Sequence, residues 1–205
     1  MKQLITVIMI ATGASVAKAD PSDLCLTAAR QAASGQGVPP ALLVALTQTE
    51  TGRSVNGETR PWPWTVNLEG EGHWFPTRAE AESYAQAAIA AGRTSFDVGC
   101  FQVNYRWHGQ EFDNLQTMFD PATNAAYAAR FVATLRQETG SWRNAAGAYH
   151  SRTPAYAERY LARFDRYYAE ADTIPVTTPH ENFYPLLRSG TAGGLGSLVP
   201  LNKGT

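Results

Sequence analysis

The stretch that decides the fold is VPPALLVALTQTETG, residues 38–52. Proline is tolerated in the first turn of a helix and glycine often ends one, so the stretch predicts a helix over 40–51. Leu43, Leu46 and Glu50 follow i, i+3, i+7 spacing and therefore share one face of that helix. The two leucines indicate that the face is buried, which places a carboxyl group on the apolar side of the helix end.

A buried carboxyl at this position has a chemical consequence. Burial disfavours the charged form of Glu50 and raises its pKa. A carboxylic acid that is neutral near pH 7 can donate a proton to a leaving oxygen, which the cleavage of a glycosidic bond requires. The alternative is that Glu50 emerges into solvent from a frayed last turn.

The rest of the chain predicts a mainly α domain over residues 22–172 with a small β element. Caps and helical periods predict helices over 22–34 with Ser22 as N-cap, over 40–51, after the Thr77–Glu80 capping box, after Asp120-Pro121, after Ser141 and after Thr153-Pro154. Residues 53–76 are rich in Gly, Pro and Trp and predict a loop that could include a short strand, and residues 97–107 are β-prone.

Residues 1–19 read as a targeting segment. Lys2 gives a positive start, residues 4–10 are mostly apolar, and residues 17–19 are Ala-Lys-Ala. This is the pattern of a secretory signal peptide cleaved before Asp20. An uncleaved anchor is the alternative, but the apolar run is shorter than the ~20 residues that span a bilayer. We therefore expect a periplasmic protein.

The chain has two cysteines, Cys25 and Cys100, 75 residues apart. Because disulfides persist in the compartment to which a signal peptide leads, the pair predicts a disulfide. Two buried free thiols are the alternative.

The last part of the chain, residues 173–205, holds five Gly and four Pro in 33 residues and predicts a flexible, disordered tail. Two apolar segments, 182–187 and 195–201, interrupt it. They are either incidental residues of a solvated tail or a segment that docks on a partner.

Composition narrows the function classes. Among 205 residues, 44% are hydrophobic and 17% are charged, which is typical of a globular domain. The net charge of -1 argues against a nucleic-acid partner. The four histidines are scattered without HExxH or C-x-x-C spacing, so no metal and no cofactor are expected.

Aromatic and amide side chains gather in the segments between the helices. The aromatic residues are Trp62, Trp64, Trp74, Phe75, Tyr105 and Trp107, and the amides are Asn67, Gln102 and Asn104. Aromatic rings pack on the apolar faces of sugars and amides bind their hydroxyls, which is typical of a carbohydrate site. The alternative is a small aromatic core.

Four segments in order resemble the catalytic domain of soluble lytic transglycosylases, the goose-type lysozyme-like family that cuts peptidoglycan. VPPALLVALTQTET resembles the family's V-P-x-L-L-x-A segment and its catalytic Glu, and Gly99–Val103 resembles G-L-M-Q-I. Asp120, Pro121 and Asn124 match D-P-x-x-N, and residues 148–151 resemble A-Y-N-A-G. The set covers residues 38–155 and implies a lysozyme-like fold.

The resemblance also implies roles for single residues. It makes Glu50 the catalytic acid and brings the Tyr149 hydroxyl close to it. The residues that we assign to substrate binding are Thr51, Phe101, Gln102, Asn104, Trp107 and His150. Thr51, Phe101 and His150 depart from the Ser, Met and Asn that the family has at these positions.

The implied reaction needs no water. Glu50 protonates the oxygen between N-acetylmuramic acid and N-acetylglucosamine, the sugar's N-acetyl group stabilises the cationic centre, and Glu50 then takes the proton of the C6 hydroxyl as a 1,6-anhydro ring closes. A hydrolytic muramidase is an alternative and would need a second carboxylate, for which Asp97 is the candidate. A non-catalytic peptidoglycan-binding assembly protein is another. Small periplasmic members of the family serve flagella and secretion systems, so residues 173–205 could dock on such a machine.

Overall fold

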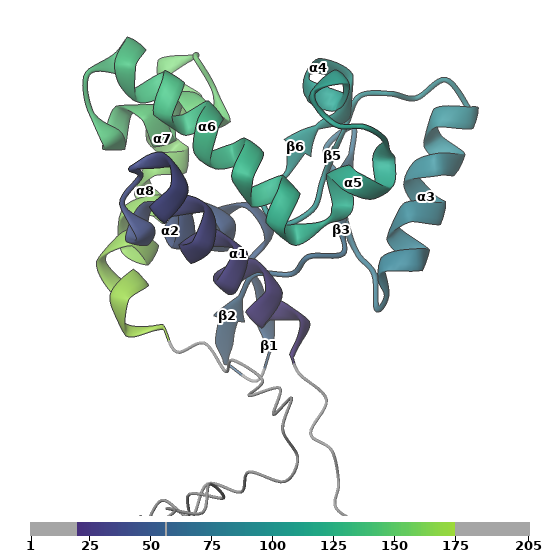
Figure 1. Cartoon of the computed structure of the whole chain (residues 1–205), viewed down its shortest axis with the longest axis horizontal. Coiled ribbons are helices and arrows are strands. Elements are labelled where there is room, and N and C mark those ends of the chain that lie inside the picture. The colour runs from purple at the N-terminus through teal and green to yellow at the C-terminus, as the bar shows by residue number, and fades with distance from the viewer. Residues whose placement is uncertain (1–19, 56, 175–205) are drawn as a thin grey trace, which may run out of the picture.

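The computed structural model describes residues 20–55 and 57–174. The predicted signal peptide, the apolar segments 182–187 and 195–201, and the rest of the predicted tail beyond residue 174 lie outside the described residues. The described part of the chain is mainly helical with a small β element, as predicted (Figure 1). None of its helices has the length and apolar character needed to cross a bilayer.

Five of the described α-helices pack on one another. The α-helices are α1 (Pro21–Gln36), α2 (Pro40–Thr51), α3 (Arg78–Ala90), α4 (Tyr105–His108), α5 (Leu115–Phe119), α6 (Pro121–Thr139), α7 (Trp142–His150) and α8 (Pro154–Glu170), with 3-10 turns at Gly109–Glu111 and Ala171–Thr173. Helix α1 packs on α2 and α6, α2 on α8, and α7 on both α6 and α8, and we call these five helices the helical group.

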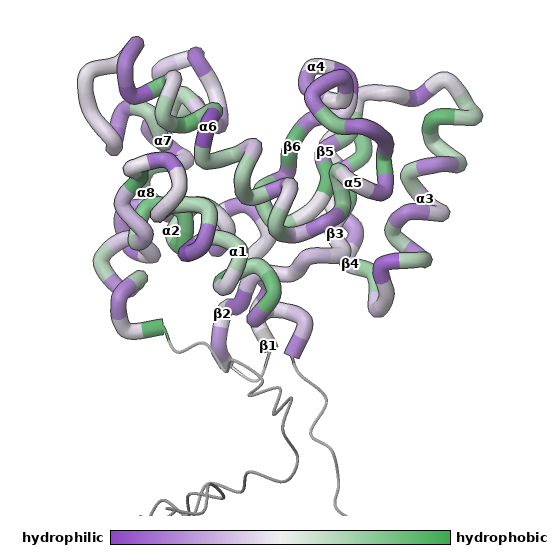
Figure 2. Tube along the Cα trace, in the orientation of Figure 1, coloured by the Kyte–Doolittle hydropathy of each residue, from purple (hydrophilic) through white to green (hydrophobic). Residues whose placement is uncertain are grey.

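Helix α2 lies at the centre of this helical group. It begins at Pro40 and ends before Gly52, as its sequence predicts. Residues 42–49 are all buried: 42–46 are apolar, as the green of α2 in Figure 2 shows, and Thr47, Gln48 and Thr49 are buried polar residues. Burial on every side explains why the helix is more apolar than a surface helix would be.

The segment 53–76 is more regular than predicted. It forms four strands, β1 (Arg53–Val55), β2 (Glu58–Arg60), β3 (Thr65–Leu68) and β4 (Glu71–Trp74). Strands β1 and β2 form a separate antiparallel pair, while the second sheet has the order β4-β3-β5-β6, with β5 at Phe96–Val98 and β6 at Val103–Asn104. The prediction of a loop with at most a short strand underestimated the β structure, because β3 is stabilised by pairing with β5, about 30 residues further along the chain.

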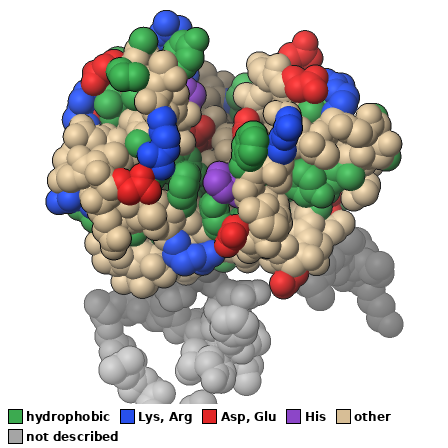
Figure 3. Space-filling view, turned by 90° about the horizontal axis from the view of Figure 1, so that it is seen from above, with side chains coloured by type: hydrophobic (Ala, Val, Ile, Leu, Met, Phe, Trp, Pro, Cys, Tyr) green, Lys and Arg blue, Asp and Glu red, His purple; other side chains and the backbone are tan. Residues whose placement is uncertain are grey.

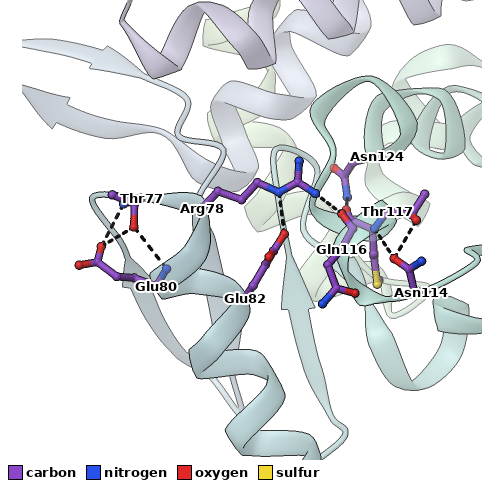
Figure 4. Close-up of polar contacts among 9 residues, drawn as sticks. Thr77, Arg78, Glu80, Glu82, Asn114, Gln116, Thr117 and Asn124 are labelled. Atoms are coloured by element: carbon purple, nitrogen blue, oxygen red, sulfur yellow. Dashed lines mark hydrogen bonds and ion pairs between the residues drawn. The ribbon is translucent and has the colours of Figure 1, made fainter.

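Helix α3 lies beside this sheet and is fixed at its N-terminus (Figure 4). The predicted capping box between Thr77 and Glu80 is present. Arg78 donates hydrogen bonds to Glu82 Oε1 and to the carbonyl oxygen of Gln116, both at 2.6 Å. The second bond ties α3 to α5. We call the sheet β4-β3-β5-β6 together with α3, α4 and α5 the β region, and this bond holds its outer part together.

The turn between β5 and β6 is held from two sides. The predicted disulfide is confirmed: it joins Cys25 of α1 to Cys100 of the turn, with 5.4 Å between the Cα atoms. Fully buried Asn124 accepts a hydrogen bond from the Phe101 amide and donates to the Val98 and Met118 carbonyls. Gly99 has φ 77°, and a Cβ there would lie 2.9 Å from the Asn124 amide nitrogen, so the turn requires glycine at this position.

The two ends of the folded domain differ slightly from the predicted bounds of 22–172. Asp20, not Ser22, caps α1, because its side chain accepts a hydrogen bond from the Ser22 amide. At the other end, Arg30 donates a 2.7 Å hydrogen bond to the Ile174 carbonyl, and Ile174 packs against the core. The folded body therefore includes residues 173–174, which the sequence analysis assigned to the tail.

Candidate active site

A cleft of about 610 Å³ lies between the helical group and the β region. Figure 3 shows the hollow, with acidic and histidine side chains inside it. The residues that line it are Thr49, Glu50, Gly52, Asn67, Trp74, Asp97, Gln102, Val103, Asn104, Trp107, His108, Tyr127, Phe131, Tyr149, His150 and Arg163. Most of the residues predicted to form the site are thus brought together.

Glu50 opens into this cleft from the last turn of α2 and is partly buried, as the sequence predicts. Tyr160 of α8 donates a 2.7 Å hydrogen bond to Glu50 Oε1. Burial raises the pKa of Glu50 to about 7, and the negative charge of Asp97 acts in the same direction, while the Tyr160 hydrogen bond and the charge of Arg163 oppose it. Near neutral pH a large fraction of this carboxyl carries a proton.

The tyrosine next to Glu50 is not the one that the resemblance assigned. Tyr149 lies in the cleft, but its hydroxyl donates to the carbonyl oxygen of Phe101 at 2.8 Å, and the phenol bonded to Glu50 belongs to Tyr160. Sequence reasoning missed Tyr160. Tyr160 precedes Leu161 and lies four residues before Phe164, on the buried side of α8. A tyrosine among the core-facing residues of this helix was therefore the sequence signal that could have identified it.

A second carboxyl lies in the same cleft. Asp97 of β5 accepts a 2.8 Å hydrogen bond from the Asn104 amide. Burial raises its pKa, and the Asn104 bond acts against that effect. Asp97 and Glu50 therefore approach the cleft from the two sides of the molecule, one from the sheet and the other from the helical group.

Two amides predicted to bind substrate line the cleft but are partly engaged within the protein. Gln102 donates to the Gly99 and Thr65 carbonyls at 3.1 and 3.3 Å and has φ 47°, a left-handed conformation that is uncommon outside glycine. Asn104 donates to Asp97 and accepts from the Trp107 amide. These contacts fix the shape of the cleft floor.

Thr51 and Phe101 are not available to a substrate, contrary to the prediction. Both are fully buried. The Thr51 hydroxyl donates to the Thr47 carbonyl and accepts from the Trp62 amide, because Thr51 follows Thr47 by one turn on the inner face of α2. Phe101 contributes its ring to the core, and its carbonyl receives the Tyr149 hydrogen bond.

Only part of the aromatic cluster faces the cleft. Trp74 and Trp107 line it and are 44% and 64% exposed, so both have ring surface free for a ligand. Trp62 lies under the Arg53 guanidinium instead, at 3.5 Å from ring centroid to Cζ. Trp64, Phe75 and Tyr105 pack against the core, which agrees with the alternative that the aromatic residues form a small core.

Two histidines line the cleft. The His150 ring stacks on Tyr160 with 4.6 Å between centroids and 9° between planes, and burial and the charge of Arg163 lower its pKa. His108 is hydrogen-bonded through Nδ1 to the Tyr127 hydroxyl at 2.7 Å. Burial lowers the pKa of His108 and raises that of Tyr127 to about 12.

Within residues 20–55 and 57–174, no group of three or more His, Cys, Asp or Glu side chains could hold a metal ion. No family model, no curated protein and no solved structure matches the chain. The chemistry of the cleft is therefore argued from its own residues.

Proposed function

We propose that this chain is a lysozyme-like lytic transglycosylase that cleaves peptidoglycan glycan strands between N-acetylmuramic acid and N-acetylglucosamine. The observation that carries the proposal is the Glu50 carboxyl, whose pKa is raised to about 7 in a cleft of about 610 Å³. A carboxylic acid in this state is suited to protonate a glycosidic oxygen. The ordered motifs of residues 38–155 support the same family.

The Tyr160 hydroxyl supports the same assignment of Glu50. It fixes Oε1, which leaves the second carboxyl oxygen to carry the proton toward the cleft. After the bond breaks, the Glu50 carboxylate accepts the C6 hydroxyl proton as the 1,6-anhydro ring closes. The same hydrogen bond stabilises this ionised form, so one residue serves first as acid and then as base.

The exposed rings of Trp74 and Trp107 offer stacking surfaces for the sugar rings on the β side of the cleft. At its floor Gln102 offers its side-chain oxygen and Asn104 its second amide hydrogen, because the other hydrogens of these amides are bonded within the protein. These residues fit an extended glycan better than a small compact ligand.

Mass spectrometry of the digestion products tests the proposal. Wild-type protein should release muropeptides that end in 1,6-anhydro-N-acetylmuramic acid, and Glu50→Gln should release none. Glu158→Gln, which removes an exposed carboxylate of α8, is the matched control and should leave the products unchanged. Wild-type protein that binds glycan strands without releasing any product would favour the non-catalytic alternative.

A hydrolytic muramidase is the second candidate, because Asp97 lies in the same cleft and raises the pKa of Glu50. A hydrolase would use this second carboxylate to activate water. Asp97→Asn should abolish activity in that case, and wild-type products should carry reducing ends. For the transglycosylase, Asp97→Asn should retain turnover and give anhydro ends.

The setting that we propose is the periplasm. The disulfide between Cys25 and Cys100 supports an oxidising compartment, in agreement with the predicted signal peptide. A wall-spanning machine bound through residues 173–205 stays a prediction, and a pull-down with and without that segment tests it.

A further inference from the structure

One side of α8 carries a line of arginines, of which the middle one, Arg163, lines the cleft. Arg159, Arg163 and Arg166 follow i, i+4, i+7 spacing and are all exposed. With Tyr156 at the start, the line runs about 15 Å along the helix, given about 1.5 Å per residue. We call these four residues the α8 basic stripe.

The arginines of the stripe lack a carboxylate partner, unlike five of the ten other arginines in the described part of the chain. Arg60, Arg78, Arg93, Arg143 and Arg152 each form an ion pair with a carboxylate. Among the described residues, no carboxylate lies within ion-pair distance of Arg159, Arg163 or Arg166. The stripe is thus a local positive surface on a chain whose net charge is -1.

The stripe is continuous with the cleft. Arg163 lines the cleft and lowers the pKa of Glu50 by its charge. Its guanidinium has a single long contact, 3.4 Å from the Thr49 carbonyl, so most of its donors are free. Arg159 lies near the ring of Tyr156 and Arg166 near that of Tyr167, which orients both side chains on the surface.

We infer that the α8 basic stripe binds the carboxylates of the stem peptides on a glycan strand held in the cleft, an inference that rests on the proposed function. In a strand that carries peptides, the lactyl carboxyl of each N-acetylmuramic acid is bound in the amide to its peptide, so the sugars are uncharged and the free carboxylates belong to the stem peptides. Guanidinium groups bind carboxylates with two parallel hydrogen bonds, so the stripe complements the peptide part of the substrate. The protein would then prefer strands that carry peptides over bare strands.

Binding to two forms of the same polymer tests the inference. The probes are glycan strands with intact stem peptides and the same strands after an amidase has removed the peptides and the freed lactyl carboxyls have been capped as methyl amides, which leaves the bare strands uncharged. Affinity is measured for Glu50→Gln protein, which prevents turnover, with and without the additional pair Arg159→Gln and Arg166→Gln. Neither arginine lines the cleft or contributes to the pKa shift of Glu50, so we expect their loss to leave the acid unchanged.

We expect the pair to weaken binding to peptide-bearing strands by about threefold to tenfold, since exposed ion pairs contribute modestly, and to leave binding to bare strands within twofold. The difference should shrink at high salt. Arg152→Gln is the matched control. Because Arg152 already pairs with Glu138, this substitution should change neither affinity.

Equal affinities of the Glu50→Gln protein for the two polymers, or an equal loss on both in the pair variant, would overturn the inference. Thermal unfolding of each variant checks that exposed substitutions leave the fold intact. The proposed function fails separately, if wild-type protein releases no anhydro products from either polymer.

Discussion

The raised pKa of Glu50 predicts that ionisation of this carboxyl destabilises the folded protein at alkaline pH. The perturbation is Glu50→Gln, which replaces the titrating carboxyl by a neutral group of similar shape. The pKa of this carboxyl changes from 4.5 when exposed to about 7 in the folded protein. At about 1.36 kcal/mol per pKa unit, ionisation in the folded state costs up to about 3 kcal/mol of stability.

The direction follows from proton binding. Below a pH of about 4.5 the carboxyl is protonated in the folded and the unfolded states, so it adds no pH dependence there. Between about 4.5 and 7 the unfolded chain loses the proton while the folded protein keeps it, and the free energy of unfolding falls as the pH rises. Above pH 7 the loss is complete.

The assay is urea unfolding of wild-type and variant protein at about pH 5 and about pH 8.5. The Glu50→Gln variant should gain up to about 3 kcal/mol relative to wild type between the two conditions. Glu158→Gln, which removes an exposed carboxylate, controls for the change in net charge. Identical pH dependence in wild type and Glu50→Gln would refute the burial of the acid, whatever the substrate.

Three further predictions concern the surroundings of this acid. Tyr160→Phe removes a hydrogen bond that lowers the pKa of Glu50. Hydrogen bonds to charged groups contribute about 1.5–3 kcal/mol. The alkaline limit of the pH–rate profile should therefore rise by about 1–2 pH units. Tyr149→Phe is its control and should leave the limit in place, because that hydroxyl contacts a backbone carbonyl. His150→Ala should lower kcat about tenfold, because it removes the ring that stacks on Tyr160. His150→Phe keeps a stacked ring and should retain kcat. Equal rates for the two variants would contradict this prediction. Replacing Cys25 and Cys100 by Ala should lower the free energy of unfolding by about 2–5 kcal/mol in urea titrations, and wild-type protein under reducing conditions should lose the same amount.

What could be predicted from the sequence was mostly local. Helix α2 and the inward side of Glu50 follow from the periodicity of a few residues, and the capping box at Thr77 follows from a pattern four residues long. The disulfide followed from the predicted compartment and from there being two cysteines.

What sequence reasoning missed depended on contacts between distant segments or on the face of a helix. Strand β3 pairs with β5, and the hairpin turn between β3 and β4 has left-handed φ values at Glu69 and Gly70 without the usual Asn-Gly pair. The placement of Asp97 opposite the helical group depends on that same sheet. Thr51 was misassigned although it follows Leu43 by eight residues and so lies near the face of α2 that the sequence predicts to be buried.

The position of Glu50 in the final turn of α2 has an electrostatic consequence of its own. The aligned peptide dipoles of a helix leave about half a negative elementary charge at its C-terminal end. Thr49 and Gly52, at that end of α2, line the cleft together with the acid. The backbone field therefore opposes a negative charge on the carboxyl. In the proposed reaction it also favours the sugar ring that becomes positively charged nearby, by about 0.3–1 kcal/mol.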